Sequence, residues 1–180
     1  MRILKAFLLI GIPFVSGQFG ILNKKGGDKR KLEETLQEAS IDANGNVDAK
    51  FQTLARELQS VAPISSQDAV NVAVILDAAK LDPETSALLA RMPEDTLKGL
   101  KDSLTPIEVV QGLKQSLDEL KAIEILFSNP ERAVLEMEKE GMLERNRVDF
   151  YKKNPHALAE DTRKGVYFTF LSLAAAGGYL

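Results

Sequence analysis

Few side chains in this sequence could do chemistry, and they form no catalytic or metal-binding pattern. His156 is the only histidine and cysteine is absent, so neither a set of imidazole ligands nor a thiolate site can form. His156 follows Asn154-Pro155 in the polar first turn of an expected helix, which favours a solvated side chain over a general base. The sequence has no Gly-x-Ser-x-Gly, no His-Glu-x-x-His and no glycine-rich phosphate loop. We therefore predict no catalytic residue, no metal ligand and no cofactor, and an enzyme acting through carboxylates alone stays open.

One acidic segment invites a test for calcium binding. Asp42-Ala-Asn-Gly-Asn-Val-Asp48 places acids or amides at positions 1, 3, 5 and 7 of a calcium loop. Val47 stands at position 6, where the loop needs glycine, and Thr53 at position 12, where it needs a bidentate glutamate. We therefore predict an Asx-rich turn, with Asn46 capping the following helix.

The strongest chemical pattern is a basic band directly before an apolar C-terminal segment. Residues 145–164 contain six Lys/Arg and three Asp/Glu, a net charge of +3, and residues 165–180 are uncharged. A basic flank beside an apolar segment is typical of proteins that meet an anionic interface. The interface candidates are Arg145, Arg147, Lys152, Lys153, Arg163, Lys164, Tyr167, Phe168, Phe170 and Leu171.

The apolar segment 165–180 has three interpretations. It is shorter than the roughly 20 residues of a membrane-spanning helix. Ala174 and Gly178 give it a small-residue face that permits close helix packing. It is a terminal helix of the core, a segment inserted into a membrane, or a lipid-anchor signal.

Charge and composition describe an acidic globular chain. The 180 residues are 44% hydrophobic and 27% charged, which suits one folded domain. The formal net charge is −3, but residues 32–144 hold 10 Lys/Arg and 22 Asp/Glu, a net charge of −12. Because nucleic-acid binding needs a contiguous basic surface, this composition argues against it.

The N-terminus has the pattern of an export signal. Arg2 and Lys5 precede an apolar run from Ala6 to Val15, and Gly17 ends a cleavage site before Gln18. Residues 1–17 are therefore predicted to be a signal peptide. Residues 18–31, which are basic and contain glycine, form a flexible linker or a second targeting element.

Phe19 is followed by five basic residues, Lys24, Lys25, Lys29, Arg30 and Lys31. With the signal before it, this arrangement resembles the bipartite presequences of proteins imported into secondary red plastids, as in diatoms. The resemblance implies entry into the secretory pathway and, after a second processing step, a plastid location. Without that step the protein is secreted.

Helix start signals recur along the rest of the chain. Asp82, Thr105, Asn129 and Asn154 each precede a proline, which places a capping side chain before proline at the first helical position. Residues 67–81 are apolar on nearly every side, which indicates a buried central helix, with a strand as the alternative. We predict an all-α fold, a single-domain bundle of about six to eight helices. It comprises a helical domain at 32–164 and an apolar C-terminal helix at 165–180.

These patterns favour a protein that binds rather than one that catalyses. We expect a non-catalytic helical interaction or structural protein of an organelle or secretory route. Its partner is a protein or a membrane surface, which it contacts through the C-terminal segment and the adjacent basic band. The alternative is a secreted helical carrier that holds a lipid or another small apolar ligand between its helices.

Overall fold

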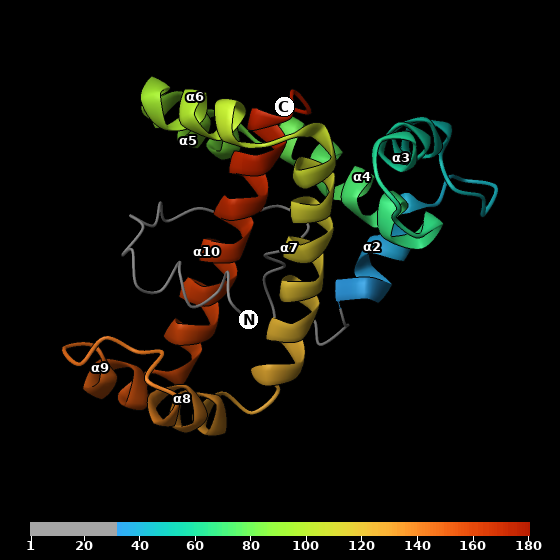
Figure 1. Cartoon of the computed structure of the whole chain (residues 1–180). Helices are drawn as coiled ribbons and strands as arrows, with labels where there is room; N and C mark the ends of the chain where they lie inside the picture. Colours follow the sequence, from blue (N-terminus) through green and yellow to red (C-terminus); the bar gives the residue numbers. More distant parts are fainter. Residues whose placement is uncertain (1–31) are drawn as a thin grey trace. The chain divides into compact units, whose positions relative to one another are not determined.

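The computed structural model describes residues 32–180, which fold as an all-α protein (Figure 1). The predicted fold class is therefore confirmed, and the predicted signal (1–17) and basic segment (18–31) lie outside these residues. The helices are α2 (Leu32–Ser40), α3 (Ala49–Val61), α4 (Ser66–Leu81), α5 (Pro83–Arg91), α6 (Glu94–Ser103), α7 (Pro106–Leu126), α8 (Pro130–Lys139), α9 (Val148–Lys153) and α10 (Pro155–Ala176). The only β pairing among residues 32–180 is an isolated bridge between Ile41 and Val47.

The chain forms two compact units. Within the described residues, unit 1 comprises 118–169 and unit 2 comprises 32–117 and 170–180. Helices α7 and α10 each belong to unit 2 over one part of their length and to unit 1 over the other.

Helix α4 is the core of unit 2. Half of its sixteen residues are buried, and it packs against α2, α3 and α5. The consecutive residues Val72, Ala73 and Val74 point to different sides of the helix, and all three are buried, which follows from a sequence that is apolar all round. The prediction of a central buried helix is confirmed, and the alternative of a strand is excluded.

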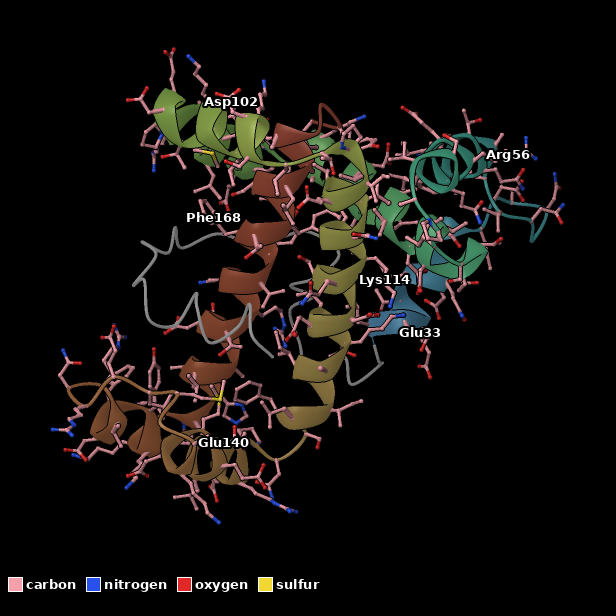
Figure 2. All side chains as sticks on the ribbon, viewed as in Figure 1. Glu33, Arg56, Asp102, Lys114, Glu140 and Phe168 are labelled. Atoms are coloured by element: carbon pink, nitrogen blue, oxygen red, sulfur yellow. The ribbon has the colours of Figure 1, made fainter. Side chains whose placement is uncertain are left out.

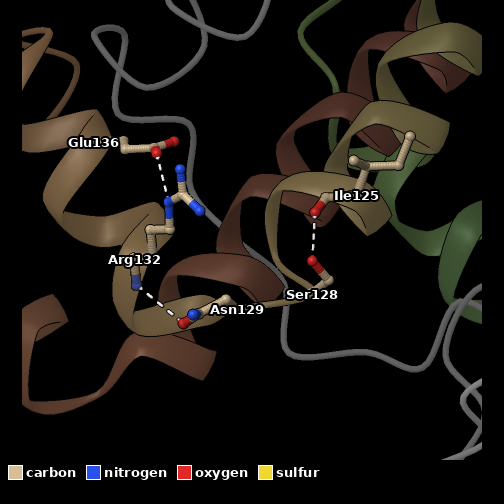
Figure 3. A network of polar contacts seen from close by, with 5 residues as sticks. All are labelled: Ile125, Ser128, Asn129, Arg132 and Glu136. Carbon is tan, nitrogen blue, oxygen red and sulfur yellow. Dashed lines mark hydrogen bonds and ion pairs between the residues drawn. The ribbon is translucent and has the colours of Figure 1, made fainter.

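Three predicted capping residues, Asp82, Thr105 and Asn129, cap the helices that follow them. Asp82 Oδ1 accepts the Glu84 N–H at 3.1 Å, and Asn129 Oδ1 accepts the Arg132 N–H at 3.2 Å (Figure 3). Thr105 and Glu108 form a capping box, in which each side chain accepts the other's N–H at 3.2 Å. These contacts satisfy N–H groups that have no partner within the helix.

Two predicted caps are wrong or used differently. Asp48, not Asn46, caps α3, because its Oδ1 accepts the Lys50 N–H at 3.0 Å. Asn154 precedes α10, but its side-chain amide donates to the Phe150 carbonyl at 3.0 Å and so closes α9.

Unit 1 contains a break that the sequence pattern did not predict. Residues 130–153 form two helices, because α8 ends in a Schellman motif around Gly141, whose φ is +68°. The Gly141 N–H donates to the Glu138 carbonyl at 3.0 Å, and the Met142 N–H donates to the Met137 carbonyl at 2.9 Å. Met137 and Met142, on either side of this turn, are both buried.

The apolar C-terminal segment is the last part of a longer helix. Helix α10 starts at Pro155 and runs through Gly165 without interruption, so no new helix begins at residue 165. In unit 2, Phe170, Leu171 and Ala174 are buried, as expected of a terminal core helix. Among residues 32–180, no helix combines the length and the apolar character needed to cross a membrane.

Helices α7 and α10 approach closely in unit 2 at two glycines. A Cβ on Gly112 would lie 2.8 Å from Leu173 Cδ1, and a Cβ on Gly177 would lie 2.6 Å from Val109 Cγ1. Of the two residues named in the prediction, Ala174 is buried, whereas a Cβ on Gly178 would meet nothing within 4 Å.

Candidate functional site

The ten interface candidates separate by burial. Tyr167, Phe170 and Leu171 are buried and Phe168, on α10 (Figure 2), is half-buried. The basic residues are the more accessible ones: Arg163 and Lys164 are half-buried, and Arg145, Arg147, Lys152 and Lys153 are exposed. The surface that a partner could contact therefore lies around α9, and the aromatic candidates of α10 belong mainly to the interior.

Phe150 adds an aromatic side chain that is absent from the ten predicted candidates. It is 48% exposed, and it is the only aromatic residue in the exposed class among residues 32–180. Its neighbour Tyr151 is buried, so adjacent rings of one short helix take opposite environments. The signal was present in the hexapeptide Val148–Lys153, where two aromatics precede two lysines. We define the α9 patch as Arg145, Arg147, Phe150, Lys152 and Lys153.

Asp161 ties α9 to α10 within unit 1. The Tyr151 hydroxyl donates to Asp161 Oδ2 at 2.8 Å. Arg147 Nη2 lies 3.9 Å from the same oxygen, at the outer limit of an ion pair. A single carboxylate on α10 therefore contacts two residues of the segment that carries the patch.

Arg147 also contacts the two rings of α9. Its guanidinium carbon lies 5.7 Å from the centre of the Phe150 ring and 5.2 Å from that of Tyr151. The two rings meet edge to face, with their centres 5.5 Å apart. Such cation–π contacts contribute about 0.5–1 kcal/mol at exposed sites, so they hold the guanidinium loosely but in a defined place.

Burial and Asp161 act in the same direction on Tyr151. Burial is the larger cause and the hydrogen bond to Asp161 the next, and together they raise the pKa of the Tyr151 hydroxyl to about 12. The charges of Asp161 and Glu144 also raise this pKa, whereas Arg147 lowers it. Tyr151 therefore keeps its proton at neutral pH and remains the donor to Asp161.

The basic side chains of the patch differ in how far they are neutralised. Lys152 Nζ pairs with Glu138 Oε2 at 2.9 Å, which links α9 to α8. Within the described part of the chain, Arg145 and Lys153 make no ion pair. Asp149 is the one acidic residue of 145–153, so this stretch carries a net charge of +3.

The acidic turn at residues 42–48 has the predicted local role. Asp42 Oδ1 accepts the Asn44 N–H at 2.8 Å and the Asn46 N–H at 3.1 Å, which makes the expected Asx turn. Residues 32–180 contain no group of three or more His, Cys, Asp or Glu side chains that could hold a metal ion.

His156, the only histidine of the chain, is exposed in the first turn of α10, as predicted for a residue at a helix start.

No protein-family model, curated protein or solved structure matches the chain. The functional assignment therefore rests on the α9 patch and its supporting contacts.

Proposed function

We propose that this chain is a non-catalytic interaction protein that docks on an anionic surface through the α9 patch. One observation carries the proposal. Four basic side chains and the only exposed aromatic of residues 32–180 occur together within residues 145–153. The preceding residues 32–144 carry a net charge of −12, so the patch contrasts with the chain before it.

This proposal shifts the contact surface from the C-terminal segment to α9. Burial of Phe170 and Leu171 leaves little of that segment for a partner. The basic residues 145–153 remain accessible, and Arg147 is held between Asp161 and two rings. A preorganised basic surface loses less side-chain freedom on binding than a flexible one.

Because the rest of the chain is acidic, the proposal can be tested by changing charges inside and outside the α9 patch. Exposed charges act over a Debye length of about 8–10 Å at ordinary salt, so a partner near α9 responds mainly to local charge. At a pH above its sequence pI of about 5.4 the chain is net negative, and general attraction to a negative matrix is absent.

The test is retention of the full chain on phosphocellulose, a matrix of phosphate groups, at neutral pH. We expect retention that salt reverses. The variant Arg145→Glu/Lys153→Glu should lose it, because each basic residue near an anionic surface contributes about 1 kcal/mol, or roughly fivefold in binding. The matched control is Arg56→Glu/Arg91→Glu, which changes the net charge by the same amount at exposed residues of unit 2 (Arg56 is labelled in Figure 2).

Two results would contradict the proposal. The first is passage of the unmodified chain through the matrix without delay. The second is equal loss of retention in both double variants, because the position of the charge would then be irrelevant.

The route to such a surface stays a prediction from the N-terminal sequence. Residues 1–17 would direct the chain into the secretory pathway, and residues 18–31 would direct it onward to a plastid if they are removed separately.

A further inference from the structure

We propose that the anionic surface is a layer of phospholipid headgroups, in which Phe150 enters the interface while the basic residues around it contact phosphates. This inference rests on the proposed function and names the partner of the same patch. It is carried by one exposed apolar ring that the Arg147 guanidinium contacts, in a stretch of nine residues with four exposed basic side chains. Such a combination matches the layered chemistry of a membrane surface.

Phe150 is the apolar component. Its ring is 48% exposed, and its neighbours include the edge-to-face ring of Tyr151 and the guanidinium of Arg147. Protein–protein interfaces bury about 800 Å² on each partner around an apolar core. An exposed aromatic ring beside an arginine does not need a partner surface of that size, because it can insert into the boundary between headgroups and acyl chains.

Arg147 is the component suited to phosphate. Its side chain is 48% exposed, and its 3.9 Å distance from Asp161 Oδ2 exceeds the 2.7–2.9 Å of a strong charge-assisted hydrogen bond. That oxygen already accepts the Tyr151 hydroxyl at 2.8 Å. The guanidinium is therefore oriented but not saturated, and its planar fork can bind two oxygens of one phosphate.

The remaining charges favour an anionic membrane over a neutral one. Arg145 and Lys153 are exposed beside Phe150 in the sequence, and they have no ion-pair partner within residues 32–180. Lys152 is linked to Glu138, so it contributes less. Insertion of Phe150 and attraction by Arg145 and Lys153 act together, and two weak signals bind a membrane more stably than one.

The experiment is flotation of the full chain with vesicles of phosphatidylcholine alone or of phosphatidylcholine mixed with phosphatidylserine. We expect binding to the mixed vesicles only. Phe150→Ala should lower the partition coefficient about tenfold, because the inserted ring is lost. Ile107→Ala, which truncates a 49% exposed side chain of unit 2, is the matched control and should leave binding unchanged.

A second pair of variants tests the guanidinium. Arg147→Lys keeps the charge but removes the fork and should lower vesicle binding several-fold. Lys153→Arg also keeps the charge and should not weaken binding. Circular dichroism of each variant checks that the helices are intact.

The outcomes separate this inference from the proposed function. Equal binding to both vesicle types, or an unchanged partition coefficient in Phe150→Ala, would overturn the lipid proposal. Absence of vesicle binding, with phosphocellulose retention that still depends on Arg145 and Lys153, would also overturn it and would indicate an anionic protein surface instead. The proposed function itself is rejected if Arg145→Glu/Lys153→Glu and Arg56→Glu/Arg91→Glu lose retention on phosphocellulose equally.

Discussion

Helix α4 of unit 2 and helix α9 of unit 1 are held in place by different interactions. In unit 2, α4 buries half of its residues, and they are almost all apolar. In unit 1, α9 buries only Tyr151, and its contacts to other helices include a hydrogen bond to α10 and an ion pair to α8. A helix that polar contacts hold at its edges can leave the rest of its surface accessible to a partner. A helix such as α4, which is buried on most sides, has little accessible surface left.

The two units also differ in the number and position of their charged residues. The described part of unit 2 holds 14 Asp/Glu and 7 Lys/Arg, and that of unit 1 holds 11 Asp/Glu and 9 Lys/Arg. Four of the nine basic residues of unit 1 fall within residues 145–153. The described part of unit 2 therefore has a net charge of −7 and that of unit 1 has −2, and the basic residues of unit 1 cluster around α9.

Removal of apolar volume from α4 should have the largest effect on stability. Leu76 is completely buried, so Leu76→Ala should lower the free energy of unfolding by about 3 kcal/mol through lost burial and a residual cavity. Urea denaturation followed by circular dichroism measures this change.

The same helix supplies the control for that experiment. Leu81, the last residue of α4, is 76% exposed, so Leu81→Ala should change the free energy of unfolding by less than about 0.5 kcal/mol. Equal changes in the free energy of unfolding for Leu76→Ala and Leu81→Ala would show that α4 is not the core of unit 2.

A smaller effect is expected where a polar contact holds α9. Tyr151→Phe removes the hydroxyl that donates to Asp161 and should lower the free energy of unfolding by about 1.5 kcal/mol at neutral pH. The folded-state pKa of about 12 lies above the ordinary value of 10.0. The contribution of the bound proton to stability is therefore complete below pH 10 and is lost as the pH rises from 10 to 12.

Absorbance of the phenolate measures the same group directly. In the unmodified protein, one tyrosine should ionise with a midpoint near pH 12, and Tyr151→Phe should lack that component. Tyr179→Phe should retain it. If the component lost in Tyr151→Phe ionises near the ordinary pKa of 10.0, burial and Asp161 do not raise the pKa of this phenol.

The smallest expected effect distinguishes two glycines by backbone conformation. Gly141 has a φ of +68° and open space where a Cβ would lie, so Gly141→Ala should destabilise the protein by about 1 kcal/mol through backbone strain alone. Gly99 lies inside α6 with equally open space and no positive φ, and Gly99→Ala should stabilise the protein by roughly 0.5–1 kcal/mol. Changes of the same sign at both positions would contradict the left-handed turn that ends α8.

Local sequence signals predicted the fold class and most helix starts. A cap residue followed by proline acts within one turn, so the starts of α5, α7 and α8 could be predicted without tertiary information. The end of α8 was missed, although Gly141 is visible in the sequence, because the acidic and apolar residues around it suit a continuing helix.

The candidate site was only partly predictable. The basic residues of 145–153 could be recognised from composition, because charge clustering needs no knowledge of contacts. The exposure of Phe150 beside the burial of Tyr151 could not, since it depends on which side of a six-residue helix faces Asp161. The burial of Phe170 and Leu171 likewise depends on packing that the apolar segment does not specify.

Gly112 and Gly177, at which α7 and α10 approach in unit 2, also limit how far one helix can shift along the other. A displacement of one turn, about 5.4 Å, would bring Glu108 or Ser116 to the place of Gly112, and each of these carries a Cβ. Since a Cβ at Gly112 would lie 2.8 Å from Leu173 Cδ1, the Leu173 side chain would have to move before such a displacement could occur. The two glycines therefore favour one axial register between α7 and the last turns of α10 in unit 2.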